Sequence, residues 1–190
     1  QWVLRQELLI LHTGTSAPGD CVIPRSGIME VSMIFVTVGS QKFPFNRLIG
    51  KIDQMIRSGF IKEDVFIQTG TSEYIPVCPH QAFCDREHFE RLMETYNILI
   101  AHGGAGTMVD AVKRGKKVIV VPRLARYEEH VDDHQMELAV RFHEMNLIRV
   151  CLDVEQLPDM LLGLDGHSFA QFQSNTEALL TSLDGYIRSL

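Results

Sequence analysis

The sequence predicts an α/β domain: a Rossmann-like parallel sheet covered by helices on both faces. Two observations predict it. Short apolar runs rich in β-branched residues alternate with segments whose apolar residues recur at helical spacing, and the clearest runs stop at glycine or proline. When strands alternate with helices, each helix carries the chain back so that the next strand runs parallel to the last, and the helices cover both faces.

The alternation becomes regular at Met33. The run MIFVTV at residues 33–38 is typical of a buried strand and is followed by the turn formers Gly-Ser. Between residues 45 and 56, apolar residues recur at i, i+3, i+4 and i+7, which is the spacing of one helix face. DVFIQTG at residues 64–70 is the second predicted strand, and residues 74–83 are predicted as a short strand broken by two prolines.

The second half of the domain continues this alternation. Helices are predicted from their apolar spacing, and strands from runs such as NILIAH and KKVIVVP, the latter closed by proline. The predicted elements are a helix at 86–96, a strand at 97–102, a helix at about 104–113, a strand at 116–122, a helix at 130–145 and a strand at 147–150.

Both ends of the chain depart from this pattern. Residues 1–32 are dense in turn formers and show no sustained period, so they are predicted as an irregular N-terminal appendage to a domain at 33–190. Near the other end, apolar residues from Phe169 to Leu190 fall close to helical spacing. Such a helix either packs on its own sheet or leaves an apolar face for a partner protein, and the sequence leaves both interpretations open.

The composition limits the possible functions. The 190 residues carry 24 acidic and 18 basic side chains, a formal net charge of −6, which argues against nucleic acid as the main partner. No apolar run approaches the roughly 18 residues that span a bilayer. The four cysteines have no CxxC spacing, so free thiols in a reducing cytoplasm are expected.

The stretch LIAHGGAGTMVD, residues 99–110, carries the strongest functional signal. In parallel α/β sheets ligands bind outside the carboxyl ends of the strands, and here three glycines follow a strand and open a helix. Such a turn lets backbone N–H groups approach a phosphate, while the helix N-terminus adds partial positive charge. A tight turn that only permits close helix–strand packing is the alternative. Two known phosphate motifs do not fit, because Thr107 replaces the P-loop lysine and Val109 replaces the third glycine of GxGxxG.

Asp110 lies about one helical turn beyond the glycines. A carboxylate there can accept two hydrogen bonds from a ribose diol, which suits a nucleotide better than an inorganic anion. The alternative is an acidic residue that only interacts with the helix dipole, an interaction worth about 0.3–1 kcal/mol.

Three segments together resemble the C-terminal, donor-binding half of the family 28 glycosyltransferases, which have the GT-B fold. They are MIFVTVGSQKFPFNRLI, LIAHGGAGTMVDAVKRGKKVIVVPR and HVDDHQMELAVRF, and the resemblance covers about residues 33–165. The combination is specific because the glycine loop and the DDHQ segment occur at this separation. Within this family the chain resembles stand-alone bacterial subunits that help build capsular and extracellular polysaccharides, which are related to the eukaryotic catalytic subunit of UDP-GlcNAc transferase.

The resemblance implies roles for individual positions. In the family the glycine loop holds the diphosphate of a UDP-sugar, and the turn after the first strand faces the phosphates from the other side. An acidic residue holds the ribose hydroxyls, main-chain groups grip the uracil, and the start of the following long helix lies near the sugar. The matching positions are Gly39 and Ser40 in the first turn, His102, Gly103, Gly104, Ala105, Gly106 and Thr107 in the loop, Asp110 at the ribose, Phe83 at the base, and Asp133, His134 and Gln135 at the sugar.

The resemblance also implies a function. We expect the UDP-sugar-binding subunit of a two-component, inverting hexosyltransferase that acts on a lipid-linked acceptor in capsular or extracellular polysaccharide synthesis. Its expected partners are the UDP-sugar and a membrane-associated acceptor-binding subunit, which holds this cytoplasmic chain at the membrane and supplies the general base. No cofactor is expected. A non-catalytic subunit that enhances a separate transferase, and an unrelated nucleotide-binding α/β module, are the alternatives.

A metal site is considered at EEHVDDH, residues 128–134. His130 and His134 are four residues apart, but the zincin pattern needs glutamate after the first histidine, and Val131 stands there. The DxD motif of manganese-dependent glycosyltransferases is also absent, because the two aspartates are contiguous. The sequence therefore predicts no metal.

Overall fold

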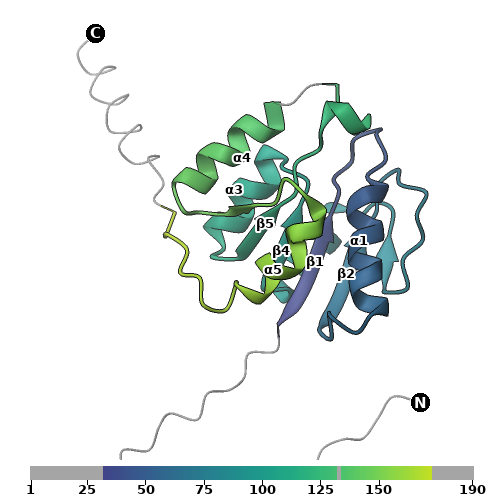
Figure 1. Cartoon of the computed structure of the whole chain (residues 1–190), viewed down its shortest axis with the longest axis horizontal. Helices are drawn as coiled ribbons and strands as arrows, with labels where there is room; N and C mark the ends of the chain where they lie inside the picture. The colour runs from purple at the N-terminus through teal and green to yellow at the C-terminus, as the bar shows by residue number, and fades with distance from the viewer. Residues whose placement is uncertain (1–31, 132–133, 173–190) are drawn as a thin grey trace, which may run out of the picture. The chain divides into compact units, whose positions relative to one another are not determined.

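The computed structural model describes residues 32–131 and 134–172, and within them the chain forms one parallel sheet flanked by helices (Figure 1). The strand order is β3-β2-β1-β4-β5-β6, and every neighbouring pair is parallel. The predicted α/β fold with a parallel sheet is confirmed. The strands are β1 (Met33–Thr37), β2 (Asp64–Gln68), β3 (His80–Gln81), β4 (Ile98–Ala101), β5 (Lys117–Val120) and β6 (Arg149–Val150).

Helices cover both faces of this sheet (Figure 1). One face carries α1 (Asn46–Arg57), the short 3-10 helix η2 (Val154–Gln156) and α5 (Leu157–Leu162). The other face carries α2 (Arg86–Thr95), α3 (Ala105–Lys113) and α4 (His134–Glu144). Among the described residues, none of the helices is long and apolar enough to cross a membrane.

The central strand β1 shows why continuous apolar runs build this sheet. Ile34 and Val36 belong to the core on the α1 side, whereas Phe35 belongs to the core on the α3 side, and all three are buried. Because helices cover both faces, both sets of alternating side chains are apolar. On the α1 side, Leu48 and Ile52 complete the core from one stripe of the helix.

The buried stripe of α1 contains one carboxylate, Asp53, which anchors the connection between β2 and β3. It accepts hydrogen bonds from Arg57 Nε at 2.7 Å, Tyr74 Oη at 2.8 Å and the Val77 backbone N–H at 2.6 Å. Burial raises the pKa of Asp53, but the hydrogen bonds from Arg57, Val77 and Tyr74 outweigh it and hold the pKa below its usual value. Asp53 is therefore ionised at neutral pH and fixes residues 74–77 along α1.

The strand predicted at residues 74–83 is wrong except for the two residues of β3, which pair with β2. Pro76 and Pro79 have no N–H to donate to a strand ladder. The Val77 N–H donates to Asp53 instead of to a neighbouring strand. The first part of the segment therefore lies along α1 and outside the sheet.

The helix predictions also need correction. The structure begins α4 at His134, not at residue 130. Helices η2 and α5 were not predicted, because elements of three and six residues are too short to show a helical period. The helix predicted at the chain end is absent from residues 168–172, which have no regular secondary structure. The rest of that helix, and the predicted appendage apart from Ser32, lie outside the described residues.

Residues 168–172 link the two faces of the sheet beside the turn that leads into β6. Phe169 packs against the core on the α1 side and Phe172 against the core on the α3 side. Asn146, at φ 57°, holds this segment: its backbone oxygen accepts from the Ala170 N–H at 2.9 Å, and its side-chain amide donates to Ser168 O at 2.8 Å. The chain therefore passes from one face to the other along a fixed path.

Candidate functional site

The loops that follow β1 and β4 meet at the carboxyl end of the sheet. After β1 the chain leaves for β2 on one side, whereas β4 lies on the other side of β1. Such a reversal opens a crevice between neighbouring strand ends, which is where parallel sheets bind ligands. It brings Gly39 and Ser40 beside the loop that begins at His102.

A cleft of about 220 Å³ lies at this place. Four of the predicted site residues line it: Gly39, Ser40, Phe83 and Thr107. The side chain of Phe83 is half-exposed at the mouth. The sequence analysis missed the other lining residues, which are Thr37, Gln68, Cys84 and Phe89. The end of β2 and the segments that follow β1 and β3 thus meet the start of α3 around one concave site.

His102 is buried between the two glycine turns. Its Nδ1 lies 3.3 Å from the backbone oxygen of Thr37, and because a carbonyl only accepts, Nδ1 carries the proton. Burial lowers the pKa of His102 to about 4, and the charge of Arg123 adds to this effect. The imidazole is therefore neutral at physiological pH, and Nε2 keeps a lone pair.

The bare backbone at Gly39 and Gly104 is required by this imidazole. A Cβ on Gly39 would lie 2.5 Å from His102 Cε1, and a Cβ on Gly104 would lie 2.5 Å from Nε2. Gly39 also has φ 75°, in the left-handed region that favours glycine. At these two positions the glycine pattern serves close packing, which is the alternative that the sequence left open.

At position 106, in contrast, packing inside the protein does not require glycine. A Cβ there would meet no atom of the described residues within 4 Å, although glycine costs about 1 kcal/mol relative to alanine inside a helix. Gly106 lies in the first turn of α3, whose N-cap residue Gly104 has no capping side chain. The first intrahelical bond runs from the Met108 N–H to Gly104 O at 3.0 Å, so the N–H groups of Ala105, Gly106 and Thr107 have no acceptor inside the helix. This helix start suits an anion that approaches closely.

Asp110 lies in α3 beyond this first turn and outside the lining of the cleft. Its Oδ1 accepts from Arg114 Nε at 3.0 Å, and Arg114 also lies 3.7 Å from a carboxylate oxygen of Glu94. The Asp110 side chain is 40% exposed, and its Oδ2 forms no hydrogen bond to the described residues. The first turn of α3 contains no acidic residue, so a contact with the helix dipole does not explain this aspartate.

The start of α4 borders the glycine loop. A Cβ on Gly103, which has φ 92°, would lie 3.6 Å from Gln135 Cβ. Gln135 Oε1 is buried and has no hydrogen-bond partner among the described residues, which is uncommon for a buried polar atom. His134 is the first residue of α4, and Asp133 lies outside the described residues. Of the three positions predicted beside the sugar, the structure thus places Gln135 against the loop.

Arg123 does not line the cleft but holds one of its loops in place, and the sequence analysis missed it. Its guanidinium is fully buried and donates to the backbone oxygens of Val38 at 2.8 Å, Phe43 at 2.8 Å and Glu129 at 3.1 Å. Burial lowers the pKa of Arg123 to about 10 against the opposing charge of Glu129, so the group stays charged at neutral pH. Arg123 therefore locks the loop after β1 to the loop after β5.

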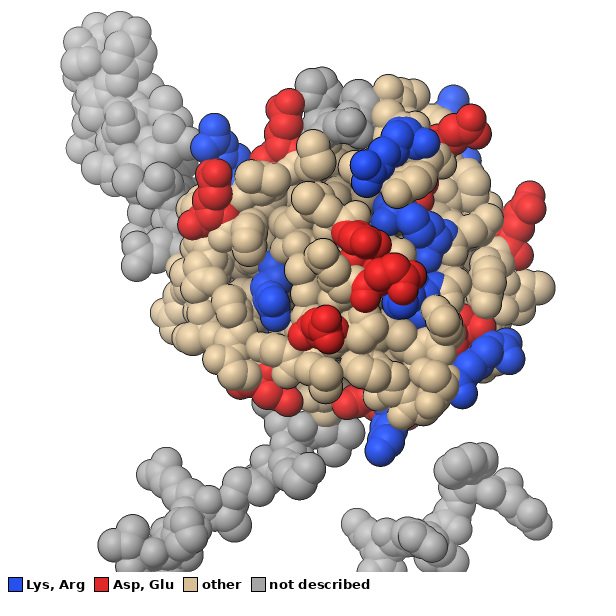
Figure 2. All heavy atoms as spheres, viewed as in Figure 1, with Lys and Arg blue, Asp and Glu red and all other residues tan. Residues whose placement is uncertain are grey.

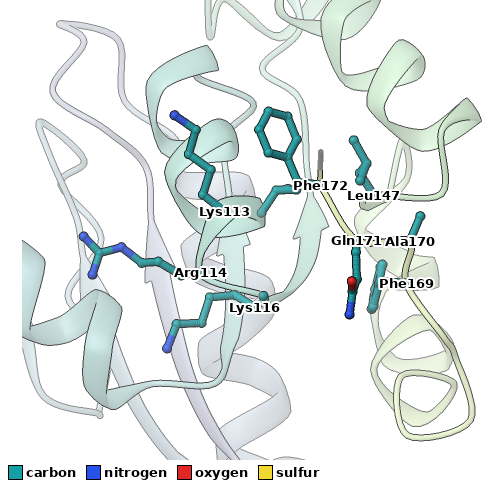
Figure 3. Close-up of a pocket in the computed structure, with 10 residues that line it drawn as sticks. Lys113, Arg114, Lys116, Leu147, Phe169, Ala170, Gln171 and Phe172 are labelled. Carbon is teal, nitrogen blue, oxygen red and sulfur yellow. The ribbon is translucent and has the colours of Figure 1, made fainter. Parts of the chain in front are cut away.

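A larger pocket, of about 500 Å³, lies away from this site, between the C-terminal end of α3 and residues 169–172 (Figure 3). It contains none of the predicted site residues. Lys113 Nζ lies 6.0 Å from the centre of the Phe172 ring, and Lys116 Nζ donates to Tyr96 O at 2.8 Å. These basic groups are engaged by the protein itself.

Positive and negative side chains are interspersed on the face shown in Figure 2. Within residues 32–131 and 134–172, no three His, Cys, Asp or Glu side chains gather closely enough to hold a metal ion. Cys78, Cys84 and Cys151 are free thiols. The absence of nucleic-acid binding and of a metal site remain predictions from the sequence.

The sheet order, with the glycine-rich start of α3 at the switch point, defines a Rossmann-like α/β domain. Its fold is that of the C-terminal domains of GT-B glycosyltransferases. The sequence profile of the glycosyltransferase family 28 C-terminal domain matches residues 33–186. The chain belongs to this family.

Solved structures share the fold at low sequence identity. The solution structure of ALG13 has a TM-score of 0.52 at 20% identity, covering 78% of this chain and 92% of that one. The crystal structure of Acinetobacter baumannii MurG has a TM-score of 0.50 at 16% identity, covering 71% of this chain and 41% of that one. The crystal structure of the glycotransferase of kitacinnamycin has a TM-score of 0.52 at 13% identity, covering 70% and 34%.

Among curated proteins, the chain is similar to the UDP-N-acetylglucosamine transferase subunit ALG13 of Candida albicans. The two are 22% identical over 99 residues, which is 52% of this chain and 32% of the relative. The chain thus spans about a third of the length of this relative.

Proposed function

We propose that the cleft binds the UDP-sugar donor of a glycosyl transfer reaction. The observation that carries this proposal is the uncapped start of α3, where the bare Gly106 lies beside Thr107, which borders the same cleft as Phe83. A diphosphate there accepts from the N–H groups of the first turn, and each such charged bond contributes about 1.5–3 kcal/mol. The uracil then lies along Phe83 at the other side of the cleft.

The remaining predicted residues have places in this proposal. Gly39 and Ser40 face the phosphates from the β1 side, Asp110 accepts from the ribose hydroxyls, and Asp133, His134 and Gln135 contact the sugar. When the bond between the sugar and the diphosphate breaks, negative charge develops on the leaving group. Fixed N–H donors at the start of α3 stabilise that charge, and the proposal needs neither a metal nor another cofactor.

The finer part of the proposal is that this chain is one subunit of a two-component, inverting hexosyltransferase. The relative from Candida albicans is named a transferase subunit, which supports a separate partner that binds the acceptor. We place that partner at the membrane, with a lipid-linked acceptor of capsular or extracellular polysaccharide synthesis. Inverting transfer needs a general base at the acceptor hydroxyl, and we assign that base to the partner.

Calorimetry with UDP tests the donor site. UDP should bind the unaltered protein, and Gly106→Leu should weaken binding by about tenfold or more, because leucine favours the helix but fills the space at its start. Gly166→Leu is the matched control, since a Cβ at Gly166 also meets no atom within 4 Å and this glycine does not line the cleft. A folded Gly106→Leu protein that binds UDP as the unaltered protein does would overturn the assignment.

A further inference from the structure

Gln68, the last residue of β2, is buried, and its carboxamide bonds to both sides of the cleft. Its Oε1 accepts from Thr37 Oγ1 at 2.5 Å and from the Gly39 N–H at 3.1 Å. Its Nε2 donates to Gly39 O and to Ala82 O, both at 2.9 Å. Gly39 belongs to the phosphate side of the proposed donor site, whereas Ala82 precedes Phe83 on the base side.

The two bonds to Gly39 extend the pairing of β1 with β2 by one step. The last backbone bond between them runs from the Val38 N–H to Gln68 O at 3.1 Å, and beyond it the Gln68 side chain takes the place of the next residue in a strand. Gly39 O points at Gln68, and a trans peptide directs its C=O and the following N–H to opposite sides. The Ser40 N–H is therefore directed away from β2, toward the side on which β4 and its glycine loop lie.

We propose that Gln68 is a positioning residue of the donor site: its carboxamide fixes the peptide between Gly39 and Ser40 so that the Ser40 N–H is aimed at the donor diphosphate, opposite the start of α3. This inference rests on the proposed UDP-sugar site and adds to it a residue that acts through the backbone. The Thr37 hydroxyl orients the carboxamide, because it donates to Oε1 and leaves Nε2 to face Gly39 O.

The base side of the cleft depends less on Gln68 than the phosphate side does. Ala82 O accepts a second hydrogen bond, from the Gly70 N–H at 2.8 Å, so backbone pairing alone also holds the segment before Phe83. Gly39 O accepts from no other donor among the described residues. Loss of the Gln68 donor therefore loosens the phosphate side selectively.

Gln68→Glu removes this donor and keeps the shape of the side chain. One carboxylate oxygen can still accept from Thr37 and Gly39, but the other oxygen faces the carbonyl of Gly39 and repels it. Calorimetry on the full chain should show that UDP affinity falls by about tenfold or more, while uridine affinity, measured by NMR titration, falls by less than about threefold. The difference between the two ligands reports the phosphate contacts, which a general loosening of the fold would not single out.

Asp53→Asn is the matched control, because Asp53 is also a buried anchor of the connection between β2 and β3 but does not line the cleft. It should leave both affinities unchanged. Because Gln68 lines the cleft, the new carboxylate can also repel the diphosphate directly. Thr37→Val removes the hydroxyl that orients the carboxamide and adds no charge, so it should show the same preference for loss of UDP only if the carboxamide positions the Gly39 peptide. Equal losses of UDP and uridine in a folded variant, or no loss, would overturn the role of Gln68. Failure of the unaltered protein to bind UDP would instead remove the donor site itself, and the proposal with it.

Discussion

The imidazole of His102 is held neutral between two turns, and this links the stability of the fold to pH. Its pKa in the folded protein is about 4, whereas histidine in an unfolded chain titrates near about 6.5. Between these values the unfolded chain binds the proton and the folded chain does not, so the free energy of unfolding decreases as the pH falls from about 6.5 to about 4. The full shift corresponds to about 3 kcal/mol.

Urea unfolding of the unaltered protein and of His102→Gln, across a pH range from about 7 to about 4, measures this contribution. The free-energy difference between the two proteins should shrink as the pH falls through this range. Carboxylates that titrate in the same range are common to both proteins and cancel in the difference. A difference that does not change with pH would show that His102 is not kept neutral by its burial.

Asp110 should hold the ribose through the oxygen that Arg114 leaves open. Asp110→Ala is expected to weaken UDP binding by about ten- to a hundredfold, or about 1.5–3 kcal/mol, because two hydroxyl contacts are lost. The exposed ion pair with Arg114 contributes at most about 1 kcal/mol, so the fold should persist. Calorimetry measures the UDP affinity of the unaltered protein and of Asp110→Ala. 2′,3′-Dideoxy-UDP lacks both ribose hydroxyls, so it should bind these two proteins about equally.

The control for this change is Glu144→Ala. Glu144 also forms an exposed ion pair on a helix, with Arg141 at 3.1 Å, but it lies in the last turn of α4. It should leave UDP affinity unchanged. If a folded Asp110→Ala protein also binds UDP with unchanged affinity, Asp110 has no part in the site.

Single residues show where sequence reasoning about the site reached its limit. Gly39 and Thr107 could be predicted, because glycine turns and family motifs mark them, and both line the cleft. Gln68 and Arg123 could not, because their roles depend on partners far away in the sequence: Arg123 bonds to Phe43 across 80 positions. The one available signal was a polar or charged residue directly after an apolar run, as in DVFIQ and VIVVPR.

At the scale of elements, strands with continuous apolar runs were predicted well because both faces of this sheet are covered. The runs at β1, β4 and β5 have no other stable place in a folded chain. The strand predicted before β3 is absent, because residues typical of strands do not by themselves provide a neighbouring strand to pair with. The backbone of this segment is held by a buried side chain of α1, and the local sequence carries no signal for such a contact.

The hydrogen bond from the Val77 N–H to Asp53 predicts that loss of this carboxylate destabilises the fold. Asp53→Ala should lower the free energy of unfolding by about 2–3 kcal/mol, because it removes three hydrogen bonds to a buried carboxylate and leaves their donors unpaired. Urea unfolding measures the cost, and faster hydrogen exchange of the Val77 amide should locate it.

An exposed pair provides the comparison. Glu90→Ala removes the ion pair with Arg86 at 2.8 Å on α2, where Arg86 is largely in solvent and Glu90 is about half-exposed. This change should leave the free energy of unfolding nearly unchanged, because water and salt screen an exposed pair. Equal effects of the two substitutions would mean that Asp53 does not anchor the segment.

At the scale of the whole molecule, the proposed donor site predicts that binding does not depend on a metal. UDP should bind with the same affinity in the presence and absence of EDTA, because backbone donors at the start of α3 carry the phosphate charge. The same comparison applies to sugar transfer by a complex reconstituted with the proposed acceptor-binding subunit. Loss of binding or transfer on chelation, with recovery on addition of manganese, would contradict the prediction.

The sheet tapers at both sides: its outer strands, β3 and β6, are two residues long. An unpaired strand edge exposes N–H and C=O groups that can pair with another chain, and very short edge strands limit this. Residues 168–170, which Asn146 holds, lie beside the turn that leads into β6. A strongly apolar sheet therefore presents little backbone to its neighbours, which protects the protein from strand-to-strand aggregation at high concentration.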